Sequence, residues 1–465
     1  MSSTDPQLLQ ACLRDLQDPR FRTLIIDFDH TLLLGNSTEL FIDHARPRGW
    51  AWFLSKLGQA TARRLFANPV QYNCWRDFFR VSFVLVGLPW SYWRWKTIAP
   101  AIGTQRLNQP LYAALQERED ATVIIASLGF RQVLLPLLPA RPKSFHLIAS
   151  SLEFPPTNLR RQGKVAAIED RQISWDVTLT VTDSVEDLAL INRSAKGYQV
   201  EWGAEPLLPP AYFPLRFTAE GKFSFKNLVR HHLLIDGLVV LLAYVDGLHS
   251  VPLLFLAYFS LFTIYEVGYY ENDFRAAGIE DVPWVAPDSG KFKDYSIYRS
   301  AWIWASGMLL AMGAAYSWLA ALRWLGLLLI LRAVFYVYNR LRPAYRVPLY
   351  IVLQGVKYFG YALLLIPSGI GLCLVAAQAF RQCLSYVLYR ISGIRRRQLP
   401  FHLIRLGIFL MLLTGGLLLG GGKFKSEVAA PLGCLIIGWV FYQALKERFG
   451  GIGYRVRQMW RWLQG

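Results

Sequence analysis

Residues 22–34, RTLIIDFDHTLLL, contain an apolar, β-branched run that leads directly into two aspartates, Asp27 and Asp29. The run has the composition of a buried strand. Two carboxylates placed two residues apart at the end of a strand can serve as a nucleophile and a neighbouring acid or base. The stretch therefore predicts an α/β domain with phosphoryl-transfer chemistry at the end of its first strand.

Three more elements follow this stretch in a consistent order. The sequence TVIIAS predicts a second buried strand that ends at Ser127, whose hydroxyl can hold a phosphoryl oxygen. Lys164, in RRQGKVAAI, opens a predicted helix and can neutralise charge in the transition state. The sequence VTLTVTDSVED predicts a third strand followed by Asp183 and Asp187, where carboxylates can hold Mg²⁺. In an open parallel sheet, such side chains meet at the carboxyl ends of the strands.

The order of these motifs resembles the haloacid dehalogenase (HAD) superfamily of aspartyl-phosphate phosphatases, over about residues 20–200. The resemblance implies a Rossmannoid parallel sheet with a helical cap and a Mg²⁺-dependent phosphatase. It implies that Asp27 is the nucleophile and Asp29 the general acid/base. By the same resemblance Thr31, Ser127 and Lys164 are phosphate-binding residues, and the candidate Mg²⁺ ligands are Asp27, Asp29, Asp183 and Asp187.

Two positions depart from the family's usual pattern, and one segment is unusual in composition. His30 replaces a small residue of the first motif, and Thr182 stands where glycine commonly precedes the acidic pair. The segment between the first two motifs is rich in Trp and Arg, which favours a helical cap over the site. Because Trp also favours the lipid–water interface, contact with a bilayer is a second interpretation.

The second half of the chain has the composition of a membrane protein. No carboxylate lies between Asp294 and Glu427, and the whole chain is 54% hydrophobic. We therefore expect a HAD-like domain over residues 1–210 and an all-α polytopic membrane domain of about eight to nine helices over residues 211–465. The stretches long and apolar enough to be the spans are 231–249, 250–270, 300–317, 318–338, 347–368, 369–389, 403–421 and 427–445.

Charge asymmetry predicts the orientation of these spans. The N-terminus is polar and lacks the pattern of a signal peptide, so we expect the front domain in the cytoplasm. Arginines then gather in the inside-facing segments, including Arg395, Arg396 and Arg397, as the positive-inside rule demands. We expect an integral protein of the inner or plasma membrane with both termini cytoplasmic. The net charge of +18 thus needs no nucleic-acid partner, and the five cysteines have no spacing that predicts disulfides or zinc.

Several charged residues lie in or beside the predicted spans, where they are costly and often functional. Lys226 and Asn227 precede the first span, and Glu266, Asn272 and Asp273 lie near the inner end of the second. Arg332, Arg340 and Lys357 follow in the fourth and fifth spans and the loop that joins them. They predict a polar cavity open to the cytoplasm. The alternative for Arg332 and Lys357 is that their side chains reach out to the lipid headgroups.

This second pattern resembles the UbiA superfamily of membrane prenyltransferases, most of all its polyprenyl-phosphate phosphoribosyltransferase branch, over about residues 215–465. The resemblance implies that Asp273 is a catalytic residue and Mg²⁺ ligand, with substrate bound by Lys226, Asn272, Arg332, Arg340 and Lys357. Two features depart from it. Ala276 replaces the second aspartate of the first acidic motif, with Glu280, Asp281 and Asp288 nearby, and the second acidic motif is absent.

Together the two halves predict a bifunctional membrane enzyme of lipid-linked sugar metabolism. Its bundle would transfer a phosphosugar to a polyprenyl phosphate, and its HAD domain would dephosphorylate the product with Mg²⁺. The alternative is a membrane-anchored HAD phosphatase whose bundle only binds a lipid phosphate. A purely structural role is the weakest hypothesis, because the HAD motif set is intact.

Overall fold

The computed structural model describes residues 6–138, 145–203, 208–275, 278–279, 285–286, 288–392 and 399–463. The chain divides into two compact units, Met1–Phe213 and Pro214–Gly465. The boundary expected from the sequence lay at residue 210. Three groups of residues singled out above, namely Ala276, Glu280 with Asp281, and the arginines at 395–397, lie outside the described residues.

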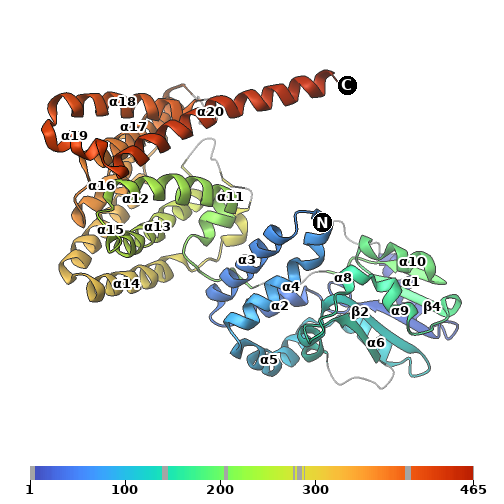
Figure 1. Cartoon of the computed structure of the whole chain (residues 1–465). Coiled ribbons are helices and arrows are strands. Elements are labelled where there is room, and N and C mark those ends of the chain that lie inside the picture. Colours follow the sequence, from blue (N-terminus) through green and yellow to red (C-terminus); the bar gives the residue numbers. More distant parts are fainter. Residues whose placement is uncertain are drawn as a thin grey trace. The chain divides into compact units, whose positions relative to one another are not determined.

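The front unit is built on a five-stranded sheet with the order β3-β2-β1-β4-β5. Figure 1 labels two of these strands, β2 and β4. Every strand pair is parallel, so the connections run back across the sheet through helices. All three strands predicted from the sequence are present as β1, β2 and β4. The bounds of the strands are β1 Thr23–Asp27, β2 Thr122–Phe130, β3 Phe145–Ser150, β4 Thr178–Thr182 and β5 Lys196–Gln199.

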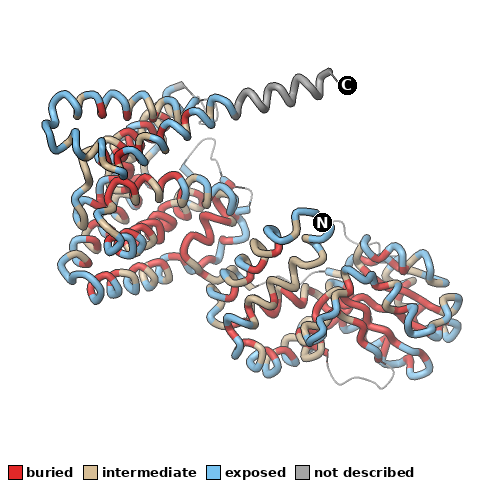
Figure 2. The backbone as a smooth tube through the Cα atoms, in the orientation of Figure 1, coloured by how far each residue is buried: buried red, intermediate tan, exposed pale blue. Residues whose placement is uncertain are grey.

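Alternate residues of the strands build two cores, because successive side chains point to opposite faces of a sheet. On β1, Leu24 and Ile26 join the larger core, whereas Ile25 joins a smaller core with Ile168 and Leu190. Helices therefore cover both faces, and the strands lie buried between them (Figure 2). Outside the cap, the helices of this unit are α1 Pro6–Leu16, α6 Gln109–Gln116, α7 Arg131–Leu134, α8 Leu159–Gln162, α9 Lys164–Glu169 and α10 Leu188–Arg193.

The predicted cap is a group of four helices inserted between β1 and β2. They are α2 Ser37–His44, α3 Arg48–Leu65, α4 Pro69–Gly87 and α5 Trp90–Arg106. Arg80 of α4 joins this group together, since its guanidinium contacts both carboxylate oxygens of Glu39 on α2 at 2.7 and 2.9 Å. Trp95 of α5 is buried against Phe41 of α2 in an edge-on contact.

The second unit is all-helical, as expected. A helix with a π-helical stretch covers Phe225–Tyr244, and the long helix α13 that follows is largely buried. Leu, Ile, Phe and Met side chains remain exposed on the later helices, which suits contact with lipid. Figure 2 shows many exposed residues along these helices. These helices are α13 Ser250–Phe274, α14 Ile297–Ala315, α15 Trp318–Tyr338, α16 Val347–Phe359, α17 Gly369–Ser392, α18 Phe401–Leu419, α19 Gly421–Ala429 and α20 Pro431–Leu463.

The number of candidate spans is smaller than the eight predicted. Among the described residues, five helices are long and apolar enough to cross a membrane, or six if the bent pair α19–α20 is one span. With the bent pair counted as one span, two predicted spans do not meet this criterion, and they correspond to α14, with 19 residues, and α16, with 13. The sequence overestimated the length of α16. The apolar run around it ends in the short 3₁₀-helix Gly360–Leu363 instead of continuing as one α-helix.

Candidate active site

The front unit places the predicted acidic residues at the carboxyl ends of neighbouring strands. Asp27 is the last residue of β1 and pairs in register with Ala126 of β2, so Ser127 follows directly beside it. Thr182 ends β4 on the other side of β1. Asp27 therefore lies between two strand ends that each contribute polar side chains, as the sequence predicted.

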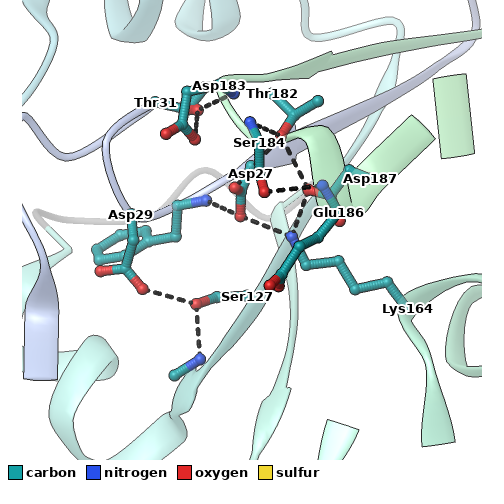
Figure 3. A network of polar contacts seen from close by, with 12 residues as sticks. Asp27, Asp29, Thr31, Ser127, Lys164, Thr182, Asp183, Ser184, Glu186 and Asp187 are labelled. Atoms are coloured by element: carbon teal, nitrogen blue, oxygen red, sulfur yellow. Dashed lines mark hydrogen bonds and ion pairs between the residues drawn. The ribbon is translucent and has the colours of Figure 1, made fainter. Parts of the chain in front are cut away.

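Lys164 connects the two acidic motifs through buried ion pairs (Figure 3). Its Nζ lies 2.8 Å from Oδ1 of Asp27 and 2.6 Å from Oδ2 of Asp187. The hydroxyl of Thr182 donates to the same Asp187 oxygen at 2.8 Å. Gly163, with a φ of 88°, turns the chain so that α9 begins at Lys164. One cation thus balances two carboxylates at the end of the sheet.

Asp29 has a different environment from Asp27, although only one residue separates them. The backbone N–H of Ser37, at the start of α2, donates to its Oδ1 at 2.6 Å, and the hydroxyl of Ser127 donates to its Oδ2 at 3.2 Å. The N–H of Gly129 in turn donates to the Ser127 hydroxyl at 3.0 Å. These contacts fix the Asp29 side chain apart from the Lys164 ion pairs (Figure 3).

Thr31 and Asp183 link the loops that follow β1 and β4. The Thr31 hydroxyl donates to Oδ1 of Asp183 and accepts from the Asp183 N–H, both at 3.0 Å. Thr31 is fully buried, so its hydroxyl holds the two loops together. Its predicted contact with substrate stays a prediction. His30, which lies between Asp29 and Thr31 in the chain, is exposed. It adopts a φ of 59°, a left-handed conformation that His tolerates better than most residues.

Burial and charge set the protonation of these groups. Burial raises the pKa of Asp27 to about 7, although the Lys164 charge opposes the shift. Burial also raises the pKa of Asp29, against the hydrogen bond from Ser37. For Lys164, burial would lower the pKa, but the charges of Asp27 and Asp187 outweigh it and raise the pKa above its usual value. Two carboxyls with raised pKa values beside a firmly protonated lysine form a site suited to acid–base work.

The carboxylates at the ends of β1 and β4 are oxygen donors of the kind that Mg²⁺ prefers. In the described part of the chain, no three His, Cys, Asp or Glu side chains form a cage for a metal ion. Mg²⁺ is commonly held by one or two carboxylates with waters and substrate phosphate oxygens. Hydrogen bonds already reach both oxygens of Asp27 and Asp29 and one oxygen each of Asp183 and Asp187, so a bound Mg²⁺ would take the place of some of these contacts. The set fits such a two-carboxylate site.

The second unit contains a cavity of about 810 Å³ among its helices. Among the described residues that form its wall, several are cations and two, Asp236 and Glu447, are carboxylates. Aromatic side chains such as Tyr265, Tyr269 and Phe335 cover much of the remaining wall. The basic side chains on the wall are Lys222, Arg230, Lys357, Arg381 and Lys446, together with the imidazoles of His231, His232 and His402.

The residues predicted for this half are only partly brought together. Asn272 and Lys357 line the cavity, and the buried Asp273 forms an ion pair with Lys222 on its wall. Arg332 instead makes a two-pronged contact with Glu271 at 2.6 and 3.0 Å. The other predicted residues are elsewhere: Arg340 folds over the ring of Tyr336, Lys226 lies exposed at the start of the first helix, and Glu266 accepts hydrogen bonds from the backbone N–H groups of Leu215 and Thr218.

Sequence reasoning missed Asp236, which is buried within the first candidate span. Its carboxylate accepts from Lys357 Nζ at 2.6 Å, from the Tyr358 hydroxyl at 2.7 Å and from Gln378 at 3.0 Å. The available signal was a lone carboxylate in the apolar run HHLLIDGLVV. It also missed Thr182 as a contributor, since glycine is usual at that position in the resembled family.

Comparison with known families supports the first of the two resemblances. Residues 24–192 match the family model of haloacid dehalogenase-like hydrolases. Comparison with curated proteins gave no match. The front unit therefore contains a haloacid dehalogenase-like domain, which a helical region with several apolar helices follows. The family match ends before the bundle, so the resemblance of residues 215–465 to UbiA stays a prediction.

Proposed function

We propose that the front unit is a membrane-tethered phosphatase that hydrolyses phosphomonoesters through Asp27. The observation that carries this proposal is the position of Lys164, which contacts both Asp27 and Asp187 at the carboxyl ends of the strands. A lysine fixed there can balance negative charge that develops on a transferring phosphoryl group. The family match over residues 24–192 supports a hydrolase of this class.

The proposed chemistry has two steps. A carboxylate oxygen of Asp27 attacks phosphorus while Asp29 donates its proton to the leaving oxygen, which gives an aspartyl phosphate and the free alcohol. Asp29, now ionised, then takes a proton from water, which attacks the phosphorus and releases phosphate from Asp27. The raised pKa of Asp29 suits its first role, because the carboxyl must be protonated when substrate binds.

Mg²⁺ is part of this proposal. Asp27 and Asp183 would hold it, and the ion would supply charge compensation for the phosphoryl oxygens. Ser37 and Ser127 keep Asp29 oriented for proton transfer. Thr31 keeps the Asp183 loop beside β1, so it acts as a positioning residue.

Asp27→Asn tests the proposal in the purified full-length chain. The substitution keeps the shape of the side chain and removes the nucleophile, so Mg²⁺-dependent hydrolysis of p-nitrophenyl phosphate should fall at least a thousand-fold. Asp176→Asn, an exposed aspartate between α9 and β4, is the matched control and should keep its activity. Activity retained in Asp27→Asn would rule out Asp27 as the nucleophile.

For the bundle we propose the function predicted from the sequence, transfer of a phosphosugar to a polyprenyl phosphate, with the lipid-phosphate receptor as its alternative. The cationic and aromatic cavity supports binding of an anionic headgroup in either case. The receptor gains support from the ion pairs, because Asp273 pairs with Lys222 and Asp236 with Lys357. A cavity wall with more cations than carboxylates also suits a phosphate group better than a metal–diphosphate.

A radiolabelled-donor assay in native membranes separates the two functions. If the bundle is a transferase, Asp273→Asn should eliminate the product formed from a polyprenyl phosphate and a donor such as phosphoribosyl pyrophosphate. If it is a receptor, no product should form with any donor, whereas Lys357→Ala should weaken binding of the polyprenyl phosphate. Lys423→Ala, at an exposed position on α19, is the matched control for a lost charge.

A further inference from the structure

Helix α3 of the cap has two faces of opposite character. Ala51, Ser55, Gly58 and Ala62 are buried at helical spacing. The opposite side exposes Trp50, Phe53 and Leu57, which are 43%, 37% and 44% accessible to solvent. We call these three residues the α3 apolar face. Large side chains grouped along one exposed stripe of a helix indicate a surface that something covers.

The charge around the α3 apolar face has one sign. No acidic residue lies between Asp43 and Asp77. The last turn of α3 carries Arg63 and Arg64, and Lys56 lies beside Leu57. The exposed Leu65 and Val70 continue the apolar character at the turn into α4. Trp and Phe beside clustered Lys and Arg is the composition of a helix that lies in the interface of an anionic membrane.

The α3 apolar face is also close to the point where the chain leaves the front unit. Phe213, the last residue of the unit, stacks on Phe53 at 5.2 Å and meets Trp50 edge-on at 5.5 Å. The first candidate membrane span begins at Phe225. A tether this short keeps the front unit beside the membrane, where even weak interfacial contacts act at high effective concentration.

We propose that the α3 apolar face docks on the surface of an anionic lipid bilayer. Trp50, Phe53 and Leu57 enter the interfacial layer, while Arg63 and Arg64 contact lipid phosphates. The proposal rests on membrane insertion of the second unit and is independent of the chemistry at Asp27. It implies that the cap of the phosphatase is held at the membrane surface, where it would meet substrates presented by lipid.

Photo-crosslinking of the full chain in nanodiscs tests this proposal. The photoreactive residue p-benzoylphenylalanine replaces Leu57, and in the matched control it replaces Leu8, a leucine of similar exposure on helix α1. In nanodiscs of phosphatidylcholine with phosphatidylglycerol, irradiation should give lipid adducts at position 57 several times more often than at position 8. Peptide mass spectrometry identifies what each position has captured.

The charge requirement is tested by a second variant. Arg63→Glu with Arg64→Glu, in the position-57 background, should lower the lipid adducts several-fold, and nanodiscs of phosphatidylcholine alone should do the same. Both changes lie on an exposed surface, so the fold and the hydrolysis of p-nitrophenyl phosphate should be retained. Crosslinks from position 57 to residues 214–449, to a second copy of the chain, or to no partner in excess of position 8 would overturn the proposal.

Discussion

The protonation of the Asp27 carboxyl depends on two opposing effects, its burial and the nearby charge of Lys164. Burial dominates and raises the pKa of Asp27 from 3.8 to about 7. In the unfolded chain this carboxyl would release its proton near pH 3.8. Between pH 3.8 and about pH 7, the folded state therefore binds more protons than the unfolded state. The free energy of unfolding of the metal-free front unit should therefore fall as the pH rises through that window.

This effect is isolated by comparison with Asp27→Asn in a chelator. The raised pKa of Lys164 keeps the lysine charged throughout, so its own ionisation does not contribute. Between pH 5 and pH 8, the thermal midpoint of the front unit should fall more in the wild-type chain than in Asp27→Asn. Parallel pH profiles of the two chains would show that the carboxyl of Asp27 is not desolvated as the structure indicates.

Motif order was enough to predict that Asp27, Asp29 and Asp187 lie at the carboxyl ends of strands, because each follows a short buried strand whose apolar pattern is plain. The roles of these residues stay predictions. Motif order did not predict the hydrogen-bond partners of Asp29. The Ser37 contact comes from a backbone N–H at a helix start, and a sequence does not specify where a backbone donor points. Asp236 was missed because its partner Lys357 lies on a distant helix, and no spacing relates the two.

At the scale of elements, the cap depends on close packing of α3 against α4. A Cβ added to Gly58 would lie 2.4 Å from the carbonyl oxygen of Phe79, closer than real Cβ contacts allow. Gly58→Val should therefore push the helices apart and destabilise the front unit by about 1–3 kcal/mol. Ala60→Val, on the other side of the same helix, should cost much less.

Thermal denaturation measures the loss of stability in Gly58→Val, and hydrolysis of p-nitrophenyl phosphate measures its effect on the active site. Since Arg80 of α4 contacts Glu39 on α2, and the start of α2 donates to Asp29, displacement of α4 should also lower activity. An unchanged thermal midpoint in Gly58→Val would show that the two helices are not packed at this distance. The sequence predicted that the cap is helical, but the approach of α3 and α4 depends on tertiary contacts that it does not encode locally.

At the scale of the whole molecule, topology depends on whether α14 and α16 cross the membrane. If both do, the eight-span arrangement places the arginine-rich segment 339–346 on the same side as residue 290. If neither does, that segment moves to the opposite side, while residues 290 and 422 keep their places. The positive-inside rule favours crossing, even though α16 is too short for a span and α14 is long enough but not apolar enough.

Single cysteines at three positions distinguish these arrangements. Gly290→Cys and Gly422→Cys are the reference positions, because a Cβ added at either meets no atom within 4 Å. Tyr345→Cys is the test position, and the Tyr345 that it replaces is 68% exposed. We expect an impermeant thiol reagent to label 290 and 345 from the cytoplasmic side and 422 from the outside. Labelling of 345 together with 422 would exclude the eight-span arrangement. Labelling of 290 and 422 from the same side would exclude both arrangements.

Composition predicts two units, because apolar residues concentrate after about residue 230 and no carboxylate lies between Asp294 and Glu427. Composition does not predict where each helix ends, because the run containing α16 has the apolar composition of a span but divides into shorter helical pieces. Hydropathy averages over such breaks. The backbone geometry that creates them appears only in the folded chain.

We propose that Asp27 carries the phosphoryl group during turnover, and the aspartyl phosphate can be trapped. Asp29→Asn removes the base that activates water, while p-nitrophenolate leaves without an acid, so the purified full chain should accumulate an aspartyl phosphate with Mg²⁺ present. Acid quenching and peptide mass spectrometry should locate the phosphoryl group on Asp27, and Asp27→Asn in the same background should abolish it. Phosphoryl transfer to another residue, or substrate turnover in Asp29→Asn with no phosphorylated Asp27, would contradict the claim.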